Sequence, residues 1–63
     1  MNKMEAMLVE GIVRGMSGEA VEEVVGNLRK IEKREDAAFN FPRARMAERI
    51  RLFVESIHTP QRP

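Results

Sequence analysis

The chain has no cysteine, no tryptophan, no tyrosine and a single histidine. Without cysteine it forms neither a disulfide nor a thiolate metal site, which excludes two common ways of stabilising a very small domain. His58 cannot hold a zinc ion alone, because a tetrahedral site needs several further ligands. We therefore expect no metal ion and no cofactor.

Long apolar runs are also missing. A membrane-spanning helix needs about 20 consecutive apolar residues, and charged residues recur too often along this chain to leave such a stretch. Glu5 and Glu10 interrupt the region in which a secretory leader would have its apolar core. These absences predict a soluble, cytoplasmic protein with no membrane partner.

The chain offers few groups for catalysis. General acid–base chemistry needs titratable side chains gathered in a sheltered cleft, whereas the acids here recur on the polar sides of predicted helices. Ser17 is the expected cap of a helix, and neither Ser56 nor Thr59 has His58 at a spacing that indicates an activated nucleophile. The sequence therefore predicts that the protein is not an enzyme.

What the chain does have is helical periodicity. Apolar residues recur at helical spacing in three stretches and predict helices over residues 2–14, 17–35 and 42–57. Ser17 is a natural N-cap, Gly15 lies where the preceding helix should end, and Pro42 fits the first turn of a helix. The pattern predicts an all-α fold, with a short helix followed by an antiparallel helical hairpin. We expect one domain over residues 1–58 and a tail over residues 59–63.

A chain of 63 residues makes one small domain, which buries only about 60% of its unfolded surface. We therefore expect the helices to complete a bundle by self-association, with a homodimer favoured. The residues predicted at this interface lie on apolar helix faces: Met4, Leu8, Ile12, Val21, Val25 and Leu28. The sequence leaves open whether the first helix packs within its own chain or on a second subunit. Phe39 and Phe41 are expected to fill the corner between the second and third helices.

The third predicted helix carries apolar side chains in two directions. Its main face comprises Met46, Ala47, Ile50, Phe53, Val54 and Ile57. Leu52 points nearly opposite to the centre of that face, at about 100° of rotation per residue. Arg45 and Arg49 lie near Leu52 on the outer side, whereas Arg51 lies on the other flank. We predict that Leu52 and these three arginines bind a partner, because arginines around an apolar centre combine charge with desolvation.

The expected function is that of a small regulatory or adaptor protein, or an inhibitor, which self-associates and binds another protein. A first alternative is a nucleic-acid-binding transcriptional regulator whose arginines contact phosphates, although the net charge is only +1. Residues 15–26, GMSGEAVEEVVG, resemble the opening of the helix–turn–helix of bacterial regulators. Residues 27–31 continue the helix where that motif needs a second tight turn. A second alternative is a structural subunit of a larger assembly.

Overall fold

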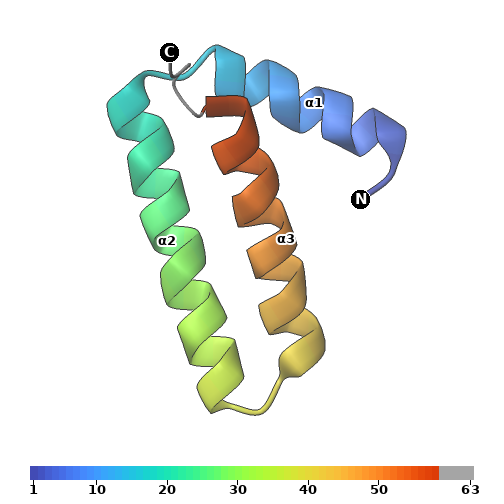
Figure 1. Cartoon of the computed structure of the whole chain (residues 1–63), viewed down its shortest axis with the longest axis vertical. Coiled ribbons are helices and arrows are strands. Elements are labelled where there is room, and N and C mark those ends of the chain that lie inside the picture. Colours follow the sequence, from blue (N-terminus) through green and yellow to red (C-terminus); the bar gives the residue numbers. More distant parts are fainter. Residues whose placement is uncertain (59–63) are drawn as a thin grey trace.

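The computed structural model describes residues 1–58, which form three helices and no strand. The helices are α1 (Lys3–Arg14), α2 (Gly18–Ala37) and α3 (Phe41–His58). α2 and α3 run side by side as an antiparallel hairpin, and α1 extends from its open end, next to α3 (Figure 1). The predicted all-α fold and hairpin are confirmed, and the predicted tail, residues 59–63, lies outside the described residues.

Local hydrogen bonds explain where the first two helices begin. The Glu5 N–H donates to the Asn2 side chain at 2.8 Å, and the Asn2 N–H donates back to the Glu5 carboxylate at 3.0 Å. This reciprocal capping box satisfies backbone donors that the first turn would otherwise leave free. Ser17 is the N-cap of α2, as predicted, because its hydroxyl accepts from the Ala20 N–H at 3.1 Å.

The corner between α2 and α3 differs from its prediction. Phe39 has a positive φ of 60° and is 80% exposed, so it does not fill the corner. Its N–H donates to the Asp36 carbonyl at 3.0 Å, and the Asn40 N–H donates to the Glu35 carbonyl at 2.8 Å. These two bonds define a Schellman motif, in which Phe39 occupies the left-handed position that glycine usually takes. The turn geometry therefore directs the ring outward, where it meets the exposed Phe41 edge-to-face at 6.3 Å.

Phe39→Gly is expected to raise the free energy of unfolding by about 0.5–1 kcal/mol, because glycine adopts positive φ without a Cβ clash. The exposed ring loses little burial, although the greater freedom of glycine in the unfolded chain offsets part of the gain. Urea unfolding followed by circular dichroism measures the change. Phe39→Ala is the matched control, since it removes the ring but keeps the Cβ. An equal gain from both variants would contradict this explanation.

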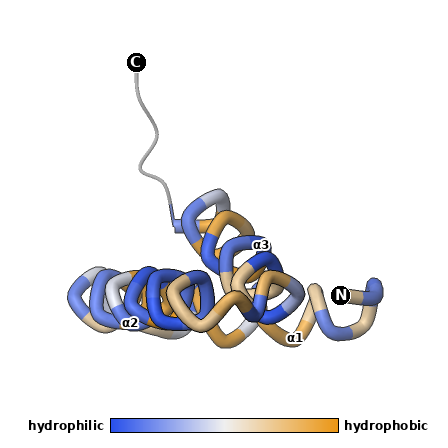
Figure 2. Tube along the Cα trace, turned by 90° about the horizontal axis from the view of Figure 1, so that it is seen from below, coloured by the Kyte–Doolittle hydropathy of each residue, from blue (hydrophilic) through white to orange (hydrophobic). Residues whose placement is uncertain are grey.

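The apolar core lies at the open end of the hairpin, where all three helices meet. Each helix contributes one buried valine, and these are Val13, Val21 and Val54. Toward the closed end, the buried residues of α3 are the small Ala44 and Ala47. α3 packs against both α2 and α1 and lies between them in Figure 1, whereas Figure 2 shows that it stands on one side of the row that α2 and α1 form. This position leaves the remaining side of α3 facing away from both neighbours.

Candidate functional site

The arginines of α3 divide into two pairs with different surroundings. Arg43 and Arg51 make ion pairs with carboxylates of α2. Arg45 and Arg49 are exposed, and neither has a carboxylate within ion-pair distance in residues 1–58. Residues four apart share a helix face, whereas residues two apart point in nearly opposite directions. Helical geometry therefore separates Arg49 from Arg51.

Arg51 is the centre of an ion-pair network between α2 and α3. Its guanidinium donates to both carboxylate oxygens of Glu32 and, at 3.1 Å, to Glu55, which also accepts from Arg29 at 3.1 Å. The Arg51 side chain is 12% exposed. The hydrogen bond to Glu32 raises the pKa of Arg51 above its ordinary value, so the group stays cationic. Arg51 is thus engaged within the chain, which removes it from the predicted partner-binding set.

Arg45, Arg49 and Leu52 remain together on the outer side of α3, and we call these three residues the α3 surface. Leu52 is 52% exposed, as its helical angle predicts. The three side chains and Glu48 line a shallow hollow of about 220 Å³. The α3 surface therefore presents an apolar centre and two cations to solvent, with the Glu48 carboxylate beside them.

A second exposed surface lies on α1. Four large apolar side chains of this helix are between 62% and 71% exposed, and they are Met4, Met7, Leu8 and Ile12. We call these four residues the outer face of α1. The opposite side of α1 packs within the chain through Val9 and Val13, so the helix uses only one of its two apolar sides internally.

The six residues predicted for self-association fall into an exposed set on α1 and a packed set on α2. Met4, Leu8 and Ile12 belong to the outer face of α1. Val21 is 0% exposed and packs against Val13 and Val54 of its own chain, while Val25 is packed against the same cluster and Leu28 is half-buried. The prediction that Val21 contacts a second chain is therefore corrected, because α1 and α3 already cover it.

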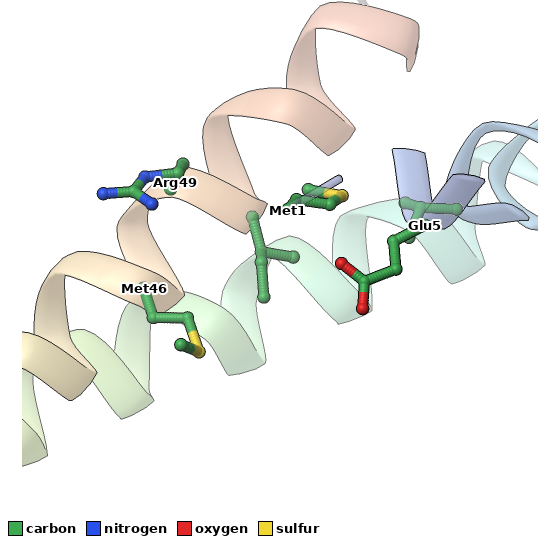
Figure 3. A pocket seen from close by; sticks show the side chains of 6 residues that line it. Met1, Glu5, Met46 and Arg49 are labelled. Atoms are coloured by element: carbon green, nitrogen blue, oxygen red, sulfur yellow. The ribbon is translucent and has the colours of Figure 1, made fainter. Parts of the chain in front are cut away.

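A groove separates the N-terminal half of α1 from α3 (Figure 3). Its volume is about 380 Å³, and its lining residues are Met1, Glu5, Val9, Met46, Arg49 and Ile50. Met46 belongs to the main apolar face predicted for the third helix but is exposed, because α1 leans away from α3 toward its N-terminus (Figure 1). The periodicity of either helix alone gives no signal for this groove, which depends on the angle between them.

Further properties of the described residues concern metal ligands, buried polar atoms and membrane-spanning helices. In residues 1–58, no group of three or more histidine, cysteine or acidic side chains could hold a metal ion. Buried side-chain nitrogen and oxygen atoms in the same part of the chain all have hydrogen-bond partners. No helix among the described residues is both long and apolar enough to cross a membrane. What stands out is therefore exposed apolar area and cations that carboxylates do not neutralise.

Comparison of the chain with protein-family models, with curated proteins and with solved structures gave no match. Function is therefore inferred from the two surfaces and the groove themselves.

Proposed function

We propose that this protein is a small, non-enzymatic regulator or adaptor, or an inhibitor, which acts in the cytoplasm by binding another protein through the α3 surface. The observation that carries the proposal is the division of the arginines. Arg51 is held by a carboxylate of α2, and the exposed Arg43 lies 3.5 Å from another, whereas Arg45 and Arg49 beside the exposed Leu52 have no carboxylate partner in the described chain.

The α3 surface matches the composition of protein interfaces that bind strongly at a few residues. Arginine is enriched at such positions, and burial of the central Leu52 would exclude water from the neighbouring charge-assisted hydrogen bonds. The cations select a partner with surface carboxylates and repel a basic one. An acidic patch with an apolar depression that accepts Leu52 is therefore the expected counterpart.

Self-association is the second part of the proposal, with a homodimer favoured. It is supported by the outer face of α1, on which four large apolar side chains remain in water. The largest apolar patch on a monomer is often a functional surface, and contact with another chain is one such use.

Binding of nucleic acid through the same arginines is the alternative. With Arg51 held by α2, the exposed arginines of α3 that could contact phosphates are Arg43, Arg45 and Arg49, with Glu48 beside the last two. Three phosphate contacts give a slope of only about −3 for the logarithm of the binding constant against the logarithm of the salt concentration, and little affinity. Fluorescence anisotropy with labelled DNA and RNA at about 50 mM salt is therefore expected to show no saturable binding. Saturable binding with a steep salt slope would favour this alternative instead.

The double variant Leu52→Asp with Arg49→Ala is expected to weaken partner binding by on the order of a hundredfold, because it removes the apolar centre and one of its two cations. Folding should be spared, since both side chains are exposed. The partner is first captured from a native extract on the immobilised protein, and its dissociation constant is then measured with purified components.

The matched control is Asn27→Asp with Lys30→Ala, which changes the net charge by the same amount at two exposed positions of α2. It should bind like the wild type. Equal binding by wild type and the α3 double variant would refute the α3 surface. Capture of no partner by a folded dimer would favour the second alternative, a structural subunit of a larger assembly.

A further inference from the structure

α1 is apolar on two opposite sides, and the chain covers only one of them. At about 100° per residue, Val9 and Val13 point toward the core, while the outer face of α1 points away from it. A helix that touches its own chain on a single side needs only one apolar stripe. The second stripe of α1 therefore indicates a second contact.

Most of the charges that border this stripe have partners within α1. Arg14 donates to the Glu10 carboxylate at 2.7 Å, and the Glu5 carboxylate accepts from the Asn2 N–H in the capping box. Lys3 is the one bordering cation with no carboxylate partner in the described part of the chain, and it lies at the N-terminal end of the helix. The outer face thus offers mainly apolar contact, unlike the α3 surface. A face of this kind does not select a charged partner. It is complementary to another uncharged apolar helix face, such as its own copy.

Gly11 lies in the middle of the outer face. It follows Met7 by four residues, Leu8 by three and Met4 by seven, so these side chains surround it on the helix. A Cβ built on Gly11 would meet nothing within 4 Å, and the space above this backbone is open. A helix from outside could therefore approach α1 more closely here than over any of the large side chains.

We infer that a second copy of the chain packs on the outer face of α1, with the two α1 helices crossing at Gly11. The inference deepens the self-association in the proposed function and is independent of the α3 surface. It assigns to Gly11, a residue that lowers helix stability, a role in close contact between chains. An isologous contact of this kind presents the same residues from both copies.

The area available suits a weak dimer. The four side chains of the outer face and Met1 are between 47% and 71% exposed and each leave roughly 100 Å² in water, so complete burial on both copies would cover at most about 1,000 Å² in total. This lies near the lower limit for a specific interface, and a micromolar dissociation constant is expected. The groove beside Met1 and Met46, with a volume of about 380 Å³, lies at the edge of this face and could admit an apolar side chain of the second copy.

Sedimentation equilibrium from about 1 to about 100 µM tests the inference, with the dimer expected to predominate at the upper end. Leu8→Glu should raise the dimer dissociation constant by at least about a hundredfold while the helical circular dichroism spectrum is retained, since it places a charge in the apolar interface. Leu52→Glu is the matched control, because it makes the same change at an exposed leucine of the α3 surface. It should leave the dimer intact, even though it would weaken partner binding.

A single thiol locates the crossing point, since the natural chain has no cysteine. Gly11→Cys should yield a disulfide-linked dimer on mild oxidation, because a disulfide requires the two Cα atoms to come within about 7 Å. Gly26→Cys, at the equally open glycine of α2, should not. A wild-type monomer at the highest concentration, or unchanged self-association of Leu8→Glu, would overturn the inference. Cross-linking at residue 26 but not at residue 11 would do the same.

Discussion

Arg51→Ala is expected to lower the free energy of unfolding by about 2–3 kcal/mol. Removal of one partner from a largely buried ion pair costs about 3–5 kcal/mol, because the remaining charge stays out of water without compensation. The smaller value applies here because Glu32 and Glu55 keep some contact with solvent, and Glu55 also keeps its bond from Arg29. Urea unfolding at fixed protein concentration measures the loss.

Arg45→Ala is the matched control for Arg51→Ala. It makes the same change on the same helix, at an exposed side chain with no carboxylate partner among residues 1–58, and should alter stability by less than about 0.5 kcal/mol. Arg51→Met combined with Glu32→Leu should recover most of the loss, since apolar residues of similar volume often replace a buried ion pair without cost. If Arg51→Ala were as mild as Arg45→Ala, Arg51 would be a solvated residue and would return to the partner-binding set.

The sequence predicts best those features that depend on interactions between residues close to one another in the chain. The helix formed by residues 3–14 follows from apolar spacing, and the start of α2 follows from the hydroxyl of Ser17. Both depend on contacts within three or four residues. The exposure of Leu52 belongs to the same class, because its direction relative to Ala47 and Val54 is set by the helix itself.

The corner at Phe39 could not be predicted in this way. Its left-handed backbone is a position at which glycine is the usual signal, and the sequence offers phenylalanine instead. Two backbone hydrogen bonds from Phe39 and Asn40 to the last turn of α2 hold the geometry. The aromatic ring of Phe39 favours burial, but the left-handed backbone at this residue directs the ring into solvent.

Contacts between helices account for the remaining differences. Arg51 meets Glu32 because of the register between α2 and α3, which the pattern of neither helix contains. Met46 is exposed because α1 diverges from α3. Helical angle already places Arg51 on the other flank from Arg45 and Arg49, but its pairing with Glu32 is seen only in the structure. The exposure of the three residues of the α3 surface agrees with their predicted positions, and partner binding by them stays a prediction.

Val21→Ala is expected to lower the free energy of unfolding by about 2–3 kcal/mol. Val21 is 0% exposed at the meeting point of the three helices, so the substitution loses its transfer free energy and leaves a cavity. Val24→Ala is the matched control on the same helix. Its side chain is 36% exposed, and a loss below about 1 kcal/mol is expected. Thermal and urea unfolding followed by circular dichroism measure both changes.

The same substitution tests whether Val21 acts within its own chain, as the structure shows, or between chains, as the sequence suggested. Dimerisation adds to apparent stability by mass action, so a residue at the interface matters only while the dimer forms. The loss caused by Val21→Ala should therefore be the same in wild type and in the Leu8→Glu background, in which the dimer is disrupted. If Val21 belonged to the interface between copies, Val21→Ala would instead cause little further loss of stability in the Leu8→Glu background. An effect of Val21→Ala that disappears when Leu8 is replaced would thus move Val21 from the core of the protomer to the contact between copies.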